Sequence, residues 1–236
     1  MKERRAYWEK IVADASARHG RQITLRPKSE SRFLWPVLQF LFSLFTYWIP
    51  IAFTFGWAKS RLQKVDIING FHSMFSSTMW LAGDGSSWEE SSTESKDATA
   101  SHEIDHLDRL YFGNGSIREE WDALEKKPKP SRLRWAWNAF RYLFWLLPFK
   151  YATYRQEFER DGYARSLQVV VHVHGGKVPD YWRQWLIVWF SGPGYGWMAT
   201  PERAEEVVKG LIEEVERVHS LGENPYARFQ QQQPRD

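Results

Sequence analysis

The stretch His102-Glu103-Ile104-Asp105-His106 carries the pattern H-E-x-x-H, and the interpretation of the whole chain depends on it. Residues four apart lie one above the other on one face of a helix, so His102 and His106 can direct two imidazole nitrogens at one point. This is the geometry of a pair of zinc ligands. Glu103 follows the first ligand, where a carboxylate can take a proton from a water that attacks a carbonyl group. The stretch therefore predicts two metal ligands and a general base.

Length and composition predict one folded domain. The chain has 236 residues, of which 43% are hydrophobic and 17% aromatic, and no linker rich in Gly, Ser or Pro divides it. We therefore expect a single domain over 1–236, with 223–236 as a flexible tail. The net charge is only +3, and the Lys and Arg residues are interspersed with carboxylates, so the sequence predicts no nucleic-acid partner.

The absence of cysteine restricts the metal chemistry. Without thiols there is no disulfide framework and no thiolate site, so a metal ion has to be held by His and carboxylate side chains. The N-terminus begins with charged residues and lacks the apolar run of a secretory signal, which predicts a cytoplasmic protein. The uncharged segment 33–57 is long enough to span a bilayer, but Pro36 and Pro50 interrupt it. We expect a buried or interfacial helix over about 36–48, with association at a membrane surface as the alternative.

Hydrophobic periodicity predicts a mainly helical α+β fold with a small sheet. Residues 22–25 and the second half of 65–81 have the composition of strands, and the second of these would run beside the helix of His102 and His106. Residues 83–99 are mostly Gly, Ser, Glu, Asp and Thr and are expected to form an exposed loop, so that Thr99 or Ser101 would cap the helix. The other expected helices cover 3–19, 133–147, 151–171, 180–190 and 201–219.

A catalytic zinc ion needs a third protein ligand and one open position. The best candidate is Glu157, on a later helix, because Asp161 follows four residues on and shares its face. Asp161 could accept the far N–H of a ligand histidine and so fix the orientation of that ring. His172 or His174 could replace Glu157 as the ligand, whereas Glu159 is expected to face away from Glu157 and to be solvated. His72 is expected either to line the cleft or to be packed.

These two motifs together resemble those of a known enzyme family. The pieces His102–His106 and Glu157–Ala164 are similar to the H-E-x-x-H and E-x-x-x-D pair of gluzincin metallopeptidases, including membrane peptidases that cleave prenylated proteins. Over about residues 30–200 the chain also resembles short, uncharacterised bacterial and phage-encoded metallopeptidase-like proteins. The resemblance implies a zincin-like fold, in which His102, His106 and Glu157 bind the metal, Glu103 is the base and Asp161 orients a ligand. Arg160 departs from the membrane branch, which usually has a small residue there.

The predicted function is that of a zinc-dependent metallopeptidase acting on a peptide or protein substrate. Tyr195, in the Gly-rich turn 191–198, is a candidate donor to the oxyanion that forms when water attacks the carbonyl, a role that a His could also fill. Two alternatives remain open. One is a zinc-stabilised, non-catalytic protein that docks on membranes or partners through 33–57 and 133–149. The other is a metal-dependent hydrolase of a non-peptide amide or ester.

Overall fold

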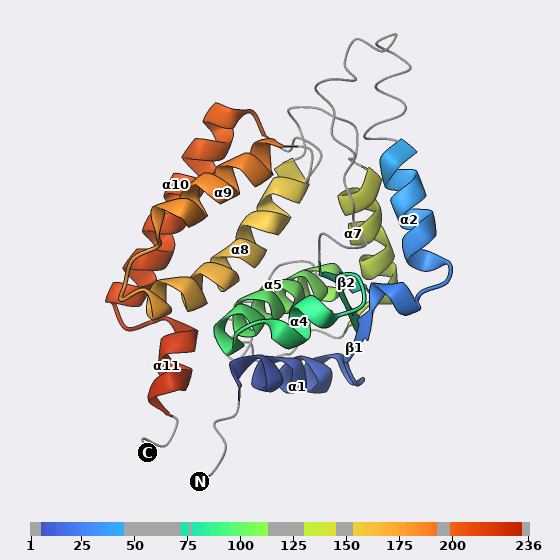
Figure 1. Ribbon diagram of the computed structural model, residues 1–236, viewed down its shortest axis with the longest axis horizontal. Coiled ribbons are helices and arrows are strands. Elements are labelled where there is room, and N and C mark those ends of the chain that lie inside the picture. Colours follow the sequence, from blue (N-terminus) through green and yellow to red (C-terminus); the bar gives the residue numbers. More distant parts are fainter. Residues whose placement is uncertain are drawn as a thin grey trace.

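The helix that carries His102 and His106, α5 (Thr93–Phe112), is the central element of the fold (Figure 1). The computed structural model describes residues 6–44, 72–75, 77–112, 130–144, 153–192 and 199–232. Within these ranges α5 packs against α1, α7, α8 and strand β2. The other helices of the described ranges are α1 (Tyr7–His19), the short 3-10 helix η1 (Lys28–Glu30), α2 (Leu34–Ser43), α4 (Ser86–Glu90), α7 (Arg132–Phe144), α8 (Thr153–Val173), α9 (Asp180–Ser191), α10 (Pro201–Ser220) and α11 (Pro225–Gln231).

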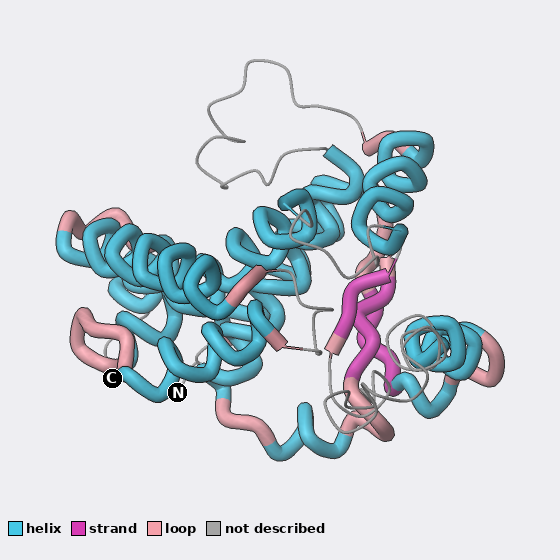
Figure 2. Tube along the Cα trace, turned by 90° about the horizontal axis from the view of Figure 1, so that it is seen from above, coloured by secondary structure: helices cyan, strands magenta, loops and turns pink. Residues whose placement is uncertain are grey.

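The sheet is small and mixed. Its strands β1 (Thr24–Pro27), β2 (Ser73–Phe75) and β3 (Thr78–Leu81) lie in the order β1-β3-β2. β3 pairs with β1 in parallel and with β2 antiparallel, and Figure 2 shows the three strands beside the helical body. The expected α+β class, mainly helical with a small sheet, is confirmed. The expected strand in the second half of 65–81 is present as two strands, β2 and β3, instead of one.

The described residues form three clusters of buried apolar side chains, of which the two larger ones are the main cores. One core joins α1, α4, α5 and β3, with buried side chains that include Trp88, Leu107 and Met79. The other joins α8, α9 and α10 around Leu167, Phe190 and Val208, among others. Burial of these apolar surfaces is the main driving force that holds each half together. The α5–α8 contact carries polar side chains, and it also holds the third cluster, in which Ala98 of α5 and Val169 of α8 pack with Tyr226.

The helix α5 starts earlier than the sequence predicted. The expected exposed loop over 83–99 is wrong, because this stretch contains α4 and the first two turns of α5. Ser92 accepts a hydrogen bond from the backbone N–H of Ser95 at 3.2 Å, so Ser92 caps the helix in place of Thr99 or Ser101. Glu94 in the first turn adds a favourable charge at the positive end of the helix dipole. Ser and Thr suit both a helix N-terminus and a loop, so composition alone does not distinguish the two here.

The aromatic segment 33–57 is described only up to residue 44. The helix expected from about residue 36 is present as α2 and begins at Leu34, with Pro36 in its first turn, where the missing N–H costs no hydrogen bond. Phe33, Val37 and Phe40 are exposed on this segment. Among the helices that the structure describes, none combines the length and the apolar content needed to cross a bilayer. Pro50 and the rest of the segment lie outside the described residues.

The expected flexible tail contains a docked helix. Asn224 accepts hydrogen bonds from the backbone N–H groups of Tyr226 and Ala227 and so caps α11. The Tyr226 ring packs edge-on against Tyr7 of α1, with ring centroids 5.1 Å apart. The prediction for 223–236 is therefore wrong as far as residue 232, and residues 233–236 lie outside the described ranges.

A buried carboxylate joins α1 and α5 and lies close to α11. Asp97 accepts a hydrogen bond from the backbone N–H of Trp8 at 2.7 Å and is fully buried. Burial raises the pKa of Asp97 from 3.8 to about 6, against the opposing effect of the Trp8 hydrogen bond. Folding therefore favours the protonated form of this group.

We predict that Asp97 makes the fold more stable in mild acid. Between pH values of about 4 and 6 the folded chain keeps a proton that the unfolded chain has lost. The resulting stabilisation is fully present below the pKa of the unfolded chain, 3.8, and is lost as the pH rises through the folded-state pKa of about 6. Asp97→Asn removes this dependence. The free energy of unfolding of wild type minus that of Asp97→Asn, measured by urea titration, should fall by roughly 2 kcal/mol from pH 4 to 7. An unchanged difference across this range contradicts the assignment.

Candidate metal centre

Three buried side chains from α5 and α8 converge on one point. Nε2 of His102 and Nε2 of His106 each lie 3.4 Å from Oε2 of Glu159. Ligands placed about 2.0–2.1 Å from a tetrahedral zinc ion stand about 3.3–3.4 Å from one another, so these two distances fit a zinc site. Among the described residues, His102, His106 and Glu159 form the one group of His, Asp or Glu with potential ligand atoms close enough to share a metal ion.

The carboxylate oxygen at the centre of this group lacks a hydrogen-bond donor. Glu159 is only 1% exposed, and its Oε2 accepts no hydrogen bond from the described residues. An ionised carboxylate without a partner is costly to bury. An oxygen aimed between two imidazole nitrogens therefore fits a cation held jointly by the three side chains.

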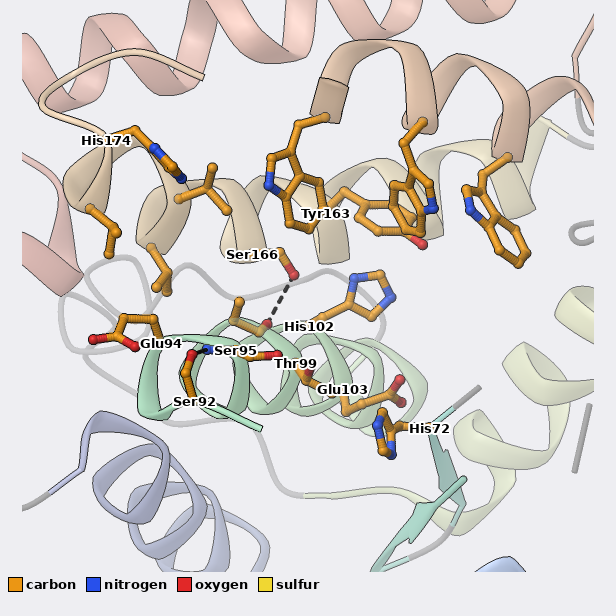
Figure 3. Close-up of a pocket in the computed structure, with 17 residues that line it drawn as sticks. His72, Ser92, Glu94, Ser95, Thr99, His102, Glu103, Tyr163, Ser166 and His174 are labelled. Carbon is orange, nitrogen blue, oxygen red and sulfur yellow. Dashed lines mark hydrogen bonds between the residues drawn. The ribbon is translucent and has the colours of Figure 1, made fainter. Parts of the chain in front are cut away.

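The site requires a close approach of the two helices. Gly162 of α8 faces both histidines, and a Cβ atom at this position would lie 2.7 Å from Cε1 of His106 and 2.9 Å from Cε1 of His102. Real Cβ contacts are not this short, so the position is restricted to glycine. About one helical turn further along, Ser166 donates a hydrogen bond to the carbonyl oxygen of Ala98 at 2.9 Å, which ties the same two helices together (Figure 3).

Aromatic side chains fix the three ligands from outside. Tyr142 of α7 donates a short hydrogen bond to Oε1 of Glu159, which leaves Oε2 directed at the histidines. The Tyr163 ring packs edge-on against His102, with centroids 4.5 Å apart. Phe158 packs against His106 at the same centroid distance. The three ligands therefore have little rotational freedom.

The charges of the group support one another in the absence of a metal ion. Burial raises the pKa of Glu159, but the neighbouring His106 and His102 outweigh it and hold that pKa well below its usual range. Burial lowers the pKa of His106, but the Glu159 carboxylate outweighs it and raises that pKa. Both shifts favour an ionised carboxylate beside a positive charge, which a bound metal ion would also supply.

Two predicted residues are placed elsewhere. Glu157 is exposed, so the structure corrects the expectation that it would join the histidines. Residues two apart on a helix point about 200° away from each other, which puts Glu159 inside when Glu157 is outside. The expectation that Glu159 would be solvated is accordingly wrong. Asp161 forms an ion pair with Arg109 instead of orienting a ligand histidine.

Glu103 lies beside the group at the end of a cleft. Its side chain is 6% exposed, and it lines the cleft together with His102 and His72. Figure 3 shows the Glu103 carboxylate and the His72 ring next to each other. Nδ1 of His72 accepts a hydrogen bond from the backbone N–H of Ala82 at 3.1 Å, so the neutral ring carries its proton on Nε2. Burial lowers the pKa of His72, and Lys28 acts in the same direction, whereas Glu103 acts against it.

The other histidines do not join the ligands. His172 packs against His219 and Tyr226, with ring centroids 5.7 and 5.4 Å away. His174 lines the cleft at the end opposite Glu103 (Figure 3). Neither therefore takes the place of a carboxylate ligand. Tyr195 lies outside the described residues.

Sequence reasoning missed three contributors: Glu159, Gly162 and Tyr142. A signal for the first two is present in the sequence. Gly162 follows Glu159 by three residues and so shares its helical face, and a glycine within a helix indicates a close approach of another element. Tyr142 comes from a different helix, and its hydrogen bond to Glu159 could not be read from spacing.

Comparison of the chain with protein-family models, with curated proteins and with solved structures gives no match. The site is therefore interpreted from its own geometry.

We predict opposite effects for the same substitution at two glycines. Gly162→Ala places a methyl group against both histidine rings and should lower the free energy of unfolding by about 1–3 kcal/mol. Gly210→Ala on α10 is the matched control, since nothing lies within 4 Å of its added Cβ. The better helix propensity of alanine should raise the stability of this variant by up to about 1 kcal/mol.

Chemical denaturation of both variants, combined with zinc titration, tests this prediction. Gly162→Ala should also bind zinc more weakly than wild type, whereas Gly210→Ala should bind it equally well. Equal zinc affinity in all three proteins would show that the histidines do not need the close approach.

Proposed function

We propose that this protein is a zinc-dependent peptidase whose ligands are His102, His106 and Glu159. The observation that carries the proposal is the convergence of the two Nε2 atoms on the unpartnered Oε2 of Glu159, with Glu103 beside them at a cleft. A buried His, His and Glu set with a neighbouring carboxylate on the same helix suits metal-assisted hydrolysis. The mainly helical fold with a small sheet agrees with a zincin-like arrangement, which remains part of this proposal.

The proposed reaction divides its tasks between the ion and the chain. When bound, zinc polarises the scissile carbonyl and lowers the pKa of the attacking water. Glu103 accepts a proton from that water and later delivers it to the leaving amine, so one carboxylate acts first as a base and then as an acid. Tyr142 keeps Glu159 in the orientation that ligation requires.

His72 is proposed to position Glu103. Because Nδ1 accepts the Ala82 N–H, the N–H donor of the ring is Nε2, and Figure 3 shows the ring next to the Glu103 carboxylate. A donor at this place can hold the base in one rotamer during proton transfer. His72 is thus a positioning residue in this mechanism.

Three Glu→Gln variants separate metal binding from chemistry. Glu159→Gln should lower zinc affinity by about 10-fold to 100-fold or more, because it removes a charged ligand. Glu157→Gln lies two residues away on the exposed face and should bind zinc like wild type. Glu103→Gln should also retain zinc but lose about 10²–10⁴ in kcat. Zinc content is measured by elemental analysis, and hydrolysis of a peptide mixture by the release of new amino groups.

The outcomes distinguish the alternatives. A wild-type protein that binds zinc stoichiometrically but cleaves neither peptides nor other amides and esters is a zinc-stabilised protein without catalysis. Cleavage of amides or esters but not of peptides assigns a different hydrolase. If Glu157→Gln lost zinc and Glu159→Gln kept it, the ligand assignment would be wrong.

We predict that His72→Asn lowers kcat without changing the zinc content. The Asn side-chain oxygen can still accept the Ala82 N–H, whereas the donor beside Glu103 is lost. We expect kcat to fall on the order of 10-fold to 100-fold, with KM, zinc content and thermal stability close to wild type. His72→Gln, which places its amide nearer the position of Nε2, should recover part of the rate. A fall in stability or zinc content that accounts for the lost activity would assign His72 a structural role.

A further inference from the structure

The cleft beside the metal centre has the size and length of a peptide-binding site. Its volume is about 480 Å³, within the usual range for ligand sites, and its walls come from α5, α8 and α9. His102 and Glu103 lie at one end, and Glu94, Ser92 and His174 lie at the other (Figure 3). From Glu94 to Glu103, helix α5 rises about 13 Å, which corresponds to about four residues of an extended chain.

One wall of the cleft is aromatic and apolar. It is formed by Trp182, Trp185 and Trp189 of α9 and by valines of α8. The Trp182 and Trp185 rings stand nearly perpendicular to each other, with centroids 5.3 Å apart, and Tyr163 contacts Trp185 at 5.6 Å. Rings held in this way offer both an edge and a face to a large side chain.

The charges that line the cleft are negative. Among its described lining residues, Glu94 and Glu103 are the two carboxylates, and there is no Lys or Arg. Glu94 is exposed and lies at the far end from the metal centre. A positive group is therefore favoured at that end by the carboxylate, and a negative group is disfavoured.

We propose that this cleft binds an extended peptide segment with two features. A large apolar side chain packs on the tryptophans, and a positive charge lies at Glu94, about four residues from the bond to be cleaved. The inference deepens the proposed peptidase function and rests on it, because it names the substrate class of the same site. It adds Trp185 and Glu94 as specificity-determining residues that touch the substrate.

Binding can be measured apart from cleavage with zinc-loaded Glu103→Gln protein. The probes are short blocked peptides that contain one Phe and a second residue that is Lys, Gln or Glu, with varied spacing between the two. Fluorescence anisotropy should show that the best Lys peptide binds about 3-fold to 10-fold more tightly than its Glu counterpart, and that this preference weakens in high salt.

Two further substitutions and their controls identify the contacts. Adding Glu94→Gln should remove most of the preference for Lys, whereas Glu90→Gln, an exposed change on α4 outside the cleft, should keep it. Adding Trp185→Ala should weaken binding of every Phe peptide about 5-fold or more. Trp137→Ala, on an exposed part of α7, is its matched control.

Each result decides between the two proposals. Equal affinity for the Lys and Glu peptides, no binding of any peptide, or a preference that persists in Glu94→Gln overturns the cleft proposal. If wild type hydrolyses peptides without such a preference, only the cleft proposal fails. If wild type hydrolyses nothing while Glu103→Gln shows the expected binding, the peptidase proposal fails and the cleft is a peptide-binding site without catalysis.

Discussion

The carboxylate of Glu159 is the constraint around which the centre of the molecule is built. It lies 1% exposed between two apolar cores, where an ionised group without compensation costs several kcal/mol. Tyr142 compensates one oxygen by a hydrogen bond, and the two histidines approach the other. Without a cation at the second oxygen the negative charge would be incompletely balanced. The geometry thus favours a positive partner at this point.

The approach of α8 to α5 makes this arrangement possible. Helices that pack through large side chains stand 8–10 Å apart, and imidazole rings in the contact would normally widen that gap. Gly162 removes the obstacle, since the rings of both histidines occupy the space where a side chain would be. The apolar cores on either side supply the stability that the polar contact does not. The close, polar contact between α5 and α8 is therefore stabilised by the apolar packing around it.

The sequence predicted the elements better than the contacts between them. H-E-x-x-H on a helix was predictable because the spacing alone puts both histidines on one face, and α5 confirms this. The third member of the buried group was not, because the four-residue spacing of Glu157 and Asp161 favoured Glu157 over Glu159. The apolar positions Phe158 and Tyr163 already indicated which face of α8 is buried, and Glu159 shares that face with Gly162. The start of α5 was missed since Ser and Thr suit both caps and loops.

The same physics gives the two ends of the cleft different tasks. At the candidate metal centre, burial strengthens every electrostatic interaction, so in the proposed mechanism a few well-fixed groups would suffice to bind an ion and move a proton. At Glu94 the carboxylate is exposed and screened, so it can bias the choice of substrate only modestly. The tryptophans of the α9 wall would contribute mainly by removing apolar surface of the substrate from water. In the proposed function, affinity thus comes from the aromatic wall, selectivity from the Glu94 end and chemistry from the Glu103 end.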